Sequence, residues 1–336
     1  MSTAILEVEG LVKHFVTRRG PFGMEETVLR AVDGVSLTVR RGEAFGLVGE
    51  SGCGKSTLGR SILRLIDPEA GSIRFAGEDI TRLSRAALRP LRRRAQIVFQ
   101  DPYASLNPKL RVGTILAEPL RVHQRLGRAT AAAEVRLLLD EVGLPASAAL
   151  RFPHEFSGGQ RQRIAIARAL ALEPELIVAD EPVSALDVSI QAQILELMRQ
   201  TMNRRGLSFL FISHDLGVVR NFCSRAAVMY LGRIVEIGPT AELFERPRHP
   251  YTQALLAASP VPEPGRGLAQ ARLEGEIASA AAPPSGCHFH PRCRHATAFC
   301  RQRYPELRQL SDDLAVACHL HDPEAADAMS PAEART

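Results

Sequence analysis

A glycine-rich stretch at residues 49–56, Gly-Glu-Ser-Gly-Cys-Gly-Lys-Ser, holds the residues of this sequence that are best suited to chemistry. Glycines let consecutive backbone N–H groups turn around phosphate oxygens, and a following helix adds the partial positive charge of its N-terminus. The apolar run at 44–48 predicts a buried strand before this stretch. We therefore expect a phosphate-binding loop in which Lys55 reaches the β- and γ-phosphates of a nucleotide and Ser56 ligates Mg²⁺. The residues expected to line it are Gly49, Ser51, Gly52, Cys53, Gly54, Lys55, Ser56 and Thr57.

Two adjacent carboxylates, Asp180 and Glu181, stand at the end of the apolar run 176–180, which is typical of a buried strand. Alone, such a pair is typical of a solvated strand end. After a phosphate-binding loop it predicts a hydrolytic site, with Asp180 on the metal side and Glu181 as the base for an attacking water.

A third motif, Ser157-Gly158-Gly159-Gln160, opens a helical run from residue 161 to residue 172. Serine and glutamine three positions apart form a capping box, so this motif predicts a helix start. The glycine pair also leaves backbone N–H groups open to an anion, which predicts a second phosphate-binding helix terminus.

Four cysteines cluster near the C-terminus with the spacing C-x5-C-x6-C-x17-C, at Cys287, Cys293, Cys300 and Cys318. In a reducing compartment such a cluster favours a metal site over disulfides. Thiolates hold zinc or iron–sulfur clusters; the close cysteine pair usual in zinc sites is missing, but several histidines surround the cysteines. From the residues alone, an iron–sulfur cluster, a mixed Cys/His zinc site and free thiols all stay open.

The composition is that of a globular chain, with 336 residues, 45% hydrophobic residues and a net charge of +5. No apolar run is long enough to cross a bilayer, and the first residues lack the features of an export signal, so we expect a cytoplasmic protein. The basic run at Arg89, Arg92, Arg93 and Arg94 predicts a solvated helix face, because no interleaved aromatics offer base stacking. We expect no nucleic-acid partner.

Hydrophobic patterning predicts an α/β fold. Residues 5–8 and 35–39 are expected to be strands of an antiparallel sheet, and 176–180 and 208–214 to be buried strands joined by a helix over 190–202, as in a parallel sheet. Residues 104–172 are expected to be mostly helical, including a helix from Thr130 to Val142 with Leu137, Leu138 and Val142 on its apolar side, and 226–237 to be a hairpin that turns near Gly232.

These motifs resemble, in their order, those of the ATP-binding subunits of ABC transporters. Residues 156–161 are similar to the signature motif, Gln100 to the Q-loop, 180–182 to the Walker B motif, 184–187 to the D-loop and His214 to the H-loop, and the resemblance covers about residues 4–260. It implies a P-loop NTPase with a RecA-like core, an antiparallel β subdomain and a helical signature subdomain at about 104–172, acting as a head-to-tail dimer. It also implies two ATP molecules, each held between one subunit's P-loop and the other's Ser157, Gly158, Gly159 and Gln160, with Glu181 as the general base. His214 would contact the γ-phosphate, Gln100 would sense Mg²⁺ and couple to the membrane subunits, and Phe15 would stack on adenine. A core position for Phe15 is the alternative.

Three longer segments, at 100–108, 181–193 and 249–253, resemble the ATPase subunits of dipeptide and oligopeptide importers. This resemblance extends nearly to residue 320 and implies a [4Fe–4S] cluster at the four cysteines. It implies as partners a second ABC ATPase subunit, either identical or homologous, two membrane permease subunits and an extracytoplasmic substrate-binding protein. The expected location is the cytoplasmic face of the inner membrane, at its periphery. Relatives of this branch also import nickel, glutathione or oligosaccharides.

We expect three segments, namely an ABC ATPase domain at 1–259, a cysteine-rich C-terminal extension at 260–321 and a disordered tail at 322–336. A soluble ABC ATPase acting on nucleic acid or ribosomes is the alternative from another class. Such proteins usually carry two cassettes or a long coiled coil, whereas this chain has one P-loop and no sustained heptad run. A redox or metal sensor built on an ATPase scaffold is a third hypothesis.

Overall fold

The computed structural model describes residues 3–19, 25–258 and 278–322. Its contacts divide the chain into two compact units. Unit 1 comprises residues 1–7, 38–44 and 74–213, and unit 2 comprises residues 8–37, 45–73 and 214–336. The expected tail, apart from residue 322, and most of the Pro-rich segment before the cysteines lie outside the described residues. Within the described residues, no helix combines the length and the apolar character needed to cross a bilayer.

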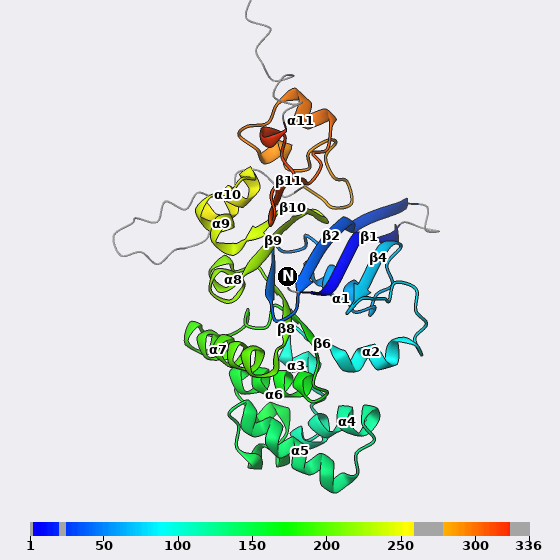
Figure 1. Ribbon diagram of the computed structural model, residues 1–336, viewed down its shortest axis with the longest axis vertical. Coiled ribbons are helices and arrows are strands. Elements are labelled where there is room, and N and C mark those ends of the chain that lie inside the picture. Colours follow the sequence, from blue (N-terminus) through cyan, green and yellow to red (C-terminus); the bar gives the residue numbers. More distant parts are fainter. Residues whose placement is uncertain (1–2, 20–24, 259–277, 323–336) are drawn as a thin grey trace, which may run out of the picture. The chain divides into compact units, whose positions relative to one another are not determined.

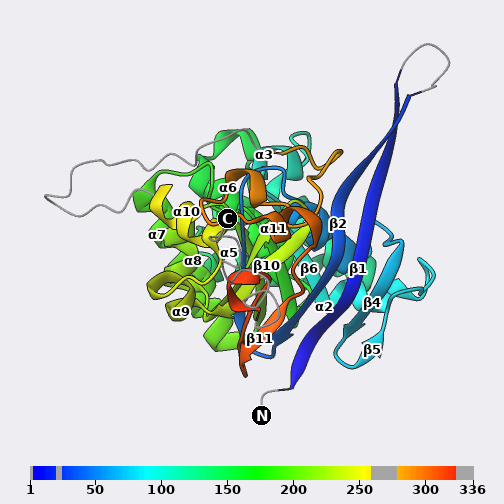
Figure 2. The same ribbon diagram turned by 90° about the horizontal axis from the view of Figure 1, so that it is seen from above.

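The N-terminal strands form the expected sheet. β1 (Ala4–Arg19) and β2 (Glu25–Arg40) are long neighbouring strands in a four-stranded sheet of order β2-β1-β4-β5, and Figure 2 shows them side by side. β4 (Ala70–Phe75) and β5 (Glu78–Asp79) complete it. In β2, Val35, Leu37 and Val39 are buried while Ser36 and Thr38 are exposed, so the alternation in the sequence matches the two faces of the strand.

In unit 2, β3 (Ala44–Val48) is buried along its whole length and pairs in parallel with β9 (Arg225–Tyr230). β9 and β10 (Arg233–Pro239) form the predicted antiparallel hairpin, with Gly232 in its turn. The helices of this unit that precede the cysteines are α1 (Lys55–Ile62), α8 (Leu216–Phe222), α9 (Thr240–Glu245) and α10 (Pro250–Ala258).

Unit 1 holds the predicted parallel strands. β7 (Leu176–Asp180) pairs with β6 (Ala95–Val98) and with β8 (Ser208–Ser213), and α7 (Val188–Arg205) connects β7 to β8. α2 (Leu88–Arg94) precedes β6 and carries the basic run. Arg89, Arg92 and Arg93 are exposed, as expected of a solvated face, whereas Arg94 pairs with Glu175.

The segment between β6 and β7 is mostly helical, as predicted (Figure 1). It contains α3 (Pro102–Ser105), α4 (Val112–His123), α5 (Arg128–Glu141), the short 3₁₀ helices η2 (Ala146–Leu150) and η3 (Pro153–Glu155), and α6 (Gly158–Leu170). One detail of the prediction is wrong. Leu137 is 63% exposed, and α5 instead buries Ala131, Val135, Leu138 and Leu139. Leu138 and Val142 are buried as predicted.

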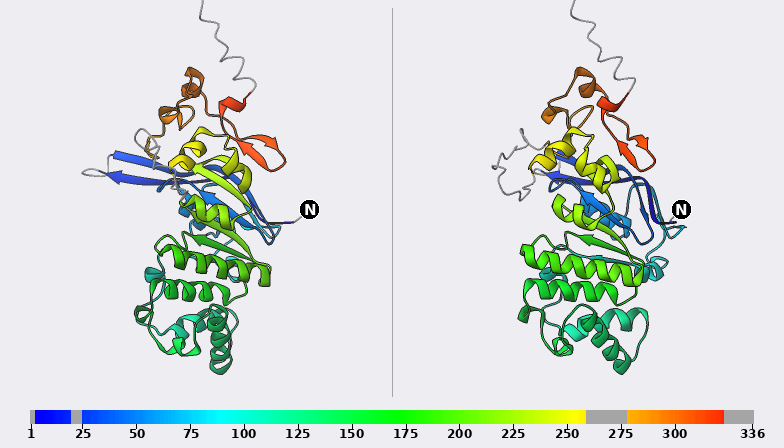
Figure 3. Two further views of the ribbon diagram at one scale, coloured as in Figure 1. Left: turned by 90° about the vertical axis from the view of Figure 1, so that its left-hand side faces the viewer. Right: turned by 60° about the vertical axis from the view of Figure 1, so that its left-hand side comes forward.

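The cysteine-rich extension belongs to unit 2 and pairs with β10 of the same unit, which the sequence did not predict. β12 (Leu314–Val316) pairs with β10, and β11 (Arg308–Ser311) pairs with β12; their hairpin is orange-red in Figure 3. Leu314, Ala315 and Val316 are buried. The extension also contains α11 (Ala298–Gln302) and two 3₁₀ helices, η4 (His290–Arg292) and η5 (His319–His321). The extension therefore shares a hydrophobic core with β10.

Replacing Leu139 with alanine should lower the free energy of unfolding by about 2–5 kcal/mol, because this fully buried side chain would leave a cavity. Leu137→Ala in the same helix should change it by less than about 0.5 kcal/mol, because that side chain is mostly exposed. Denaturant unfolding of both variants measures the difference. Equal losses would contradict this assignment of the buried face of α5.

Candidate nucleotide-binding and thiol sites

The loop between β3 and α1 has the backbone conformation that the sequence predicts. Gly49, Gly52 and Gly54 have φ angles of 154°, 79° and 108°. A Cβ atom at Gly49 would lie 2.2 Å from the carbonyl oxygen of Met229, and one at Gly54 would lie 1.9 Å from that of Ala31. Both positions therefore require glycine for two reasons, namely positive φ and close backbone packing.

Lys55 begins α1 and lies inside the loop. Its Nζ donates hydrogen bonds to the carbonyl oxygens of Gly49, at 2.8 Å, and Glu50, at 2.9 Å. Only 4% of Lys55 is exposed, so its charge is held at the centre of the loop. Cys53 is also buried, and burial raises the pKa of its thiol despite the nearby Lys55 ammonium. A protonated, buried thiol is unreactive, which fits a small packing residue.

The other predicted residues of this loop are more accessible. Ser51 is exposed, and Ser56 and Thr57 are half-buried in the first turn of α1. Phe15, in β1, is 37% exposed, so it is not a core residue. The ammonium of Lys13 lies 5.3 Å from the centroid of the Phe15 ring. The exposed part of this ring offers an aromatic surface that can accept a planar base.

In unit 1, the carboxylate pair ends β7 as predicted. Asp180 is 1% exposed, and Glu181 has a φ angle of 47°, a left-handed conformation that is unusual for a residue with a side chain. The Glu181 N–H donates to the carbonyl oxygen of Ile212 in β8, at 2.9 Å. Gln100 Nε2 donates to Glu181 Oε2, also at 2.9 Å. The structure thus brings Gln100 and Glu181 together, although 81 positions separate them.

The capping box at the start of α6 is confirmed. The N–H of Gln160 donates to Ser157 Oγ at 3.4 Å, and the N–H of Ser157 donates to Gln160 Oε1 at 3.1 Å. Ser157, Gly158 and Gln160 are exposed, so this helix terminus is accessible to an anion. A Cβ atom at Gly159 would lie 2.5 Å from Ile190 Cγ2 in α7, which gives this glycine a packing role as well.

Gln191 was not singled out from the sequence as a site residue. Its Nε2 donates to the carbonyl oxygens of Val183 and Leu186, both at 3.0 Å, and so fixes the loop that follows Glu181. A lone glutamine near the start of a helix carries no signal that predicts these bonds. His214 follows β8 directly and is exposed.

Two residues far along the chain contact the phosphate-binding loop and were also missed. Arg292 Nη1 and Nη2 donate to Glu50 Oε2 and Oε1, at 2.9 and 3.0 Å. The Glu50 N–H donates to the hydroxyl of Tyr251 at 2.9 Å, and the ring of Tyr230 packs against that of Tyr251, tilted by 50°, with 4.6 Å between centroids. All of these residues belong to unit 2.

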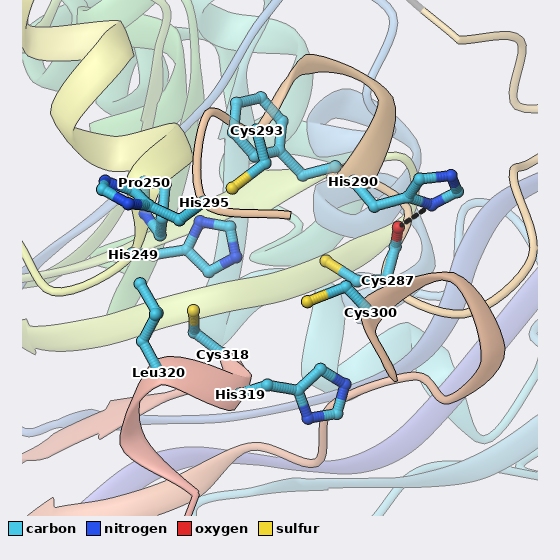
Figure 4. A pocket seen from close by; sticks show the side chains of 11 residues that line it. His249, Pro250, Cys287, His290, Cys293, His295, Cys300, Cys318, His319 and Leu320 are labelled. Carbon is cyan, nitrogen blue, oxygen red and sulfur yellow. Dashed lines mark hydrogen bonds between the residues drawn. The ribbon is translucent and has the colours of Figure 1, made fainter. Parts of the chain in front are cut away.

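The four clustered cysteines line one pocket, together with His249, His290, His295 and His319, and Figure 4 shows their sulfur atoms turned toward a common space. Burial raises the pKa of Cys287 to about 11, with further increases from Cys300 and Cys293, and burial raises the pKa of Cys318 to about 12. Burial therefore favours the protonated thiols, and a metal ion that binds here displaces their protons. Among the residues that the structure describes, no group of three or more His, Cys, Asp or Glu side chains is arranged to hold a metal ion.

One of the histidines that line this pocket, His249, is buried, and its burial favours the neutral ring. Burial lowers the pKa of His249 to about 3, with a further decrease from His321. His249 Nδ1 accepts a hydrogen bond from the N–H of Tyr251 at 3.0 Å, so the ring fixes the start of α10. This contact assigns it a structural role.

Two family models match the chain. A model described as "ABC transporter" matches residues 32–184, and one described as "Oligopeptide/dipeptide transporter, C-terminal region" matches residues 235–300. A probable peptide ABC transporter ATP-binding protein of Sinorhizobium fredii is 53% identical over 98% of this chain and 94% of its own length. The oligopeptide transport ATP-binding protein AppF of Bacillus subtilis is 50% identical over 94% of this chain and 97% of its own length.

Solved structures agree with these sequence relatives. The ATP-binding cassette MJ0796, in a dimeric post-hydrolysis state with ADP and phosphate, has a TM-score of 0.62 and 28% identity over 70% of this chain and 98% of its own. The chain belongs to the ABC transporter ATP-binding proteins, in the branch that carries the oligopeptide/dipeptide transporter C-terminal region.

Proposed function

We propose that this chain hydrolyses ATP to drive the import of di- or oligopeptides through a membrane permease. The observation that carries the proposal is the combination of the phosphate-binding loop at 49–56 with the peptide-transporter C-terminal region at 235–300. This region also favours an importer subunit over a soluble ATPase that acts on nucleic acid or ribosomes. The names of the relatives from Sinorhizobium and Bacillus support peptides over nickel, glutathione or oligosaccharides as the substrate class.

In the proposed mechanism, the loop N–H groups and Lys55 bind the nucleotide phosphates, and Ser56 and Asp180 would hold the Mg²⁺ that accompanies ATP. Glu181 accepts the proton of the attacking water, and Gln100, hydrogen-bonded to the Glu181 carboxylate, fixes its orientation. Gln100 would also sense the Mg²⁺ and couple the nucleotide site to the permease. His214 contacts the γ-phosphate, and Phe15 stacks on the adenine.

The exposed N-terminus of α6 is proposed to bind the ATP held by a second ATPase subunit, through Ser157, Gly158, Gly159 and Gln160. The dimeric state of the MJ0796 cassette supports this arrangement. The proposed assembly joins two ATPase subunits, identical or homologous, to two permease subunits and an extracytoplasmic substrate-binding protein. The chain would then act at the cytoplasmic face of the cell membrane.

We also propose that Cys287, Cys293, Cys300 and Cys318 hold a [4Fe–4S] cluster. Four thiolates are the usual ligands of such a cluster, and all four cysteines line one pocket. A zinc ion requires its ligands at about 2.0–2.3 Å from a single point. Zinc held by these cysteines and the neighbouring histidines of the pocket is the alternative. A cluster would supply folding energy to the extension by joining cysteines before and after η4, within α11 and before η5.

Glu181→Gln should lower the rate of ATP hydrolysis by about 10²- to 10⁴-fold while ATP binding persists, because an amide keeps the shape but accepts no proton. Lys55→Ala should instead weaken ATP binding, by about 10- to 100-fold if a charged hydrogen bond is lost. Steady-state hydrolysis and calorimetric titration separate the two effects. A Glu181→Gln rate within a few-fold of the unmodified chain would remove Glu181 from its proposed role.

The transport assignment is tested with the assembled complex. The tagged chain, purified from detergent-extracted native membranes, should bring permease subunits with it. In proteoliposomes with the substrate-binding protein, peptides should stimulate ATP hydrolysis and enter with it, and Glu181→Gln should abolish both. Stimulation by nickel, glutathione or an oligosaccharide in place of peptides would reassign the substrate.

Protein purified anaerobically should be brown and contain about four irons per chain, as expected of a cubane cluster with four thiolate ligands. Cys300→Ser should bleach this colour, whereas Cys223→Ser, at a buried cysteine outside the pocket, should keep it. Elemental analysis and visible absorbance make the measurement without any assay of turnover. Stoichiometric zinc without iron would overturn the cluster assignment.

A further inference from the structure

The phosphate-binding loop contains an acidic residue, Glu50, directly after its first glycine. A carboxylate this close to a site for nucleotide phosphates is unfavourable, because like charges a few ångströms apart repel each other. Glu50 is paired with Arg292 through two parallel hydrogen bonds of 2.9 and 3.0 Å. The side chain of Arg292 is 3% exposed and that of Glu50 is 16% exposed, so solvent screens the pair only weakly.

Arg292 is held in place by the thiol pocket. It ends η4, and the pocket is lined both by Phe289, three residues before it, and by Cys293, directly after it. The N–H of Arg292 donates to the carbonyl oxygen of Phe289 at 3.0 Å, and the N–H of Cys293 donates to that of His290 at 3.3 Å. The position of the guanidinium thus depends on the same short turn that places Cys293.

A second contact fixes Glu50 from the same side. The hydroxyl of the fully buried Tyr251 accepts the Glu50 N–H, and the ring of Phe289 packs against Tyr251 with 5.4 Å between centroids. Phe289 also meets Tyr230 edge to face at 5.5 Å. The backbone and the side chain of Glu50 are therefore both bound by elements that contact the thiol pocket or belong to it.

The position of Glu50 matters for the rest of the loop. Its carbonyl oxygen accepts hydrogen bonds from Lys55 Nζ, at 2.9 Å, and from the N–H of Cys53, at 3.3 Å. A shift of Glu50 would move the peptide units that face the phosphates and the ammonium that binds them.

We propose that Arg292 is a positioning residue that neutralises Glu50 and links nucleotide binding at the loop to the integrity of the thiol pocket. The link is reciprocal, because a pocket that holds Arg292 in place favours nucleotide binding, and bound nucleotide must then stabilise the pocket by the same factor. The proposal rests only on ATP binding at residues 49–56, so it stands or fails independently of the transported substrate and of the metal.

The first test is a double-mutant cycle on nucleotide affinity in the full chain. Arg292→Ala should raise the Kd for Mg-ATP by about tenfold, a factor common for coupled sites, because it leaves the Glu50 carboxylate unpaired beside the phosphates. In a Glu50→Gln background the same Arg292→Ala change should have an effect of less than about threefold, since the charge to be neutralised is gone. Arg292→Lys should lose less affinity than Arg292→Ala. Arg301→Ala, at an exposed arginine of the same extension, is the matched control.

A merely structural role for Arg292 would give equal losses in both backgrounds, and that result would overturn the proposal. Unchanged affinity in Arg292→Ala would overturn it as well. Circular dichroism shows whether each variant folds. If Arg292→Ala does not fold, the loss of Mg-ATP affinity is compared instead between Arg292→Lys and Arg292→Lys/Glu50→Gln.

The second test measures the reciprocal direction. Hydrogen–deuterium exchange of the peptides that cover residues 287–293, whose N–H groups at Cys287, Arg292 and Cys293 are hydrogen-bonded, is followed by mass spectrometry in the full chain with and without saturating Mg-ADP. Nucleotide should slow this exchange several-fold in the unmodified chain but leave it unchanged in Arg292→Ala. Calorimetric titration with Mg-ADP confirms separately that both proteins bind nucleotide. Equal exchange with and without nucleotide in the unmodified chain would show that the two sites are not coupled.

Discussion

The lack of space for a side chain at Gly49 and Gly54 is the constraint on which the nucleotide site depends. At both positions a Cβ atom would strike a backbone carbonyl, of Met229 in one case and of Ala31 in the other. The loop can therefore turn its N–H groups inward only while it packs directly against the C-terminal end of β9, next to the turn that follows, and against β2. The parallel pairing of β3 with β9, from Phe45 with Arg225 to Val48 with Val228, holds that turn in place. Phosphate binding is thus a property of the packed sheet and not of the loop alone.

The elements that could be predicted from the sequence have in common that a few neighbouring residues define each of them. The phosphate-binding loop and the capping box are contiguous motifs whose chemistry is set by a few residue types, so neighbours in space are neighbours in sequence. β3, β7 and β8 are continuous apolar runs, and β2 alternates clearly, so their burial could also be read from the pattern. Leu137 shows where this reasoning stops. Three leucines in a row, 137–139, fit more than one choice of buried face, and the packing of α4, α6 and η2 around α5 decides between them.

The contacts that could not be predicted from the sequence join single polar residues that lie far apart along the chain. The Arg292–Glu50 pair spans 242 positions, and the Gln100–Glu181 bond spans 81. Neither residue of the first pair belongs to a periodic pattern, and an arginine near the cysteines is one of many in this arginine-rich chain. β11 and β12 were missed for a related reason. They are short, β11 is exposed along its whole length, and only their pairing with β10 makes them strands.

Glu181 and Glu50 are both held by neighbouring residues in positions that are unfavourable for an isolated glutamate. Glu181 has a left-handed backbone, a costly arrangement for a residue with a side chain, and it is held there by its N–H bond to Ile212, by Gln100 on its carboxylate and by Ser184 on its carbonyl oxygen. Glu50 places a negative charge inside a phosphate-binding loop, and Arg292 and Tyr251 hold it in position. In both cases neighbouring residues offset an unfavourable feature of the glutamate, namely the left-handed backbone of Glu181 and the charge of Glu50. The geometry of the site is therefore as sensitive to these supporting residues as to the residues that react.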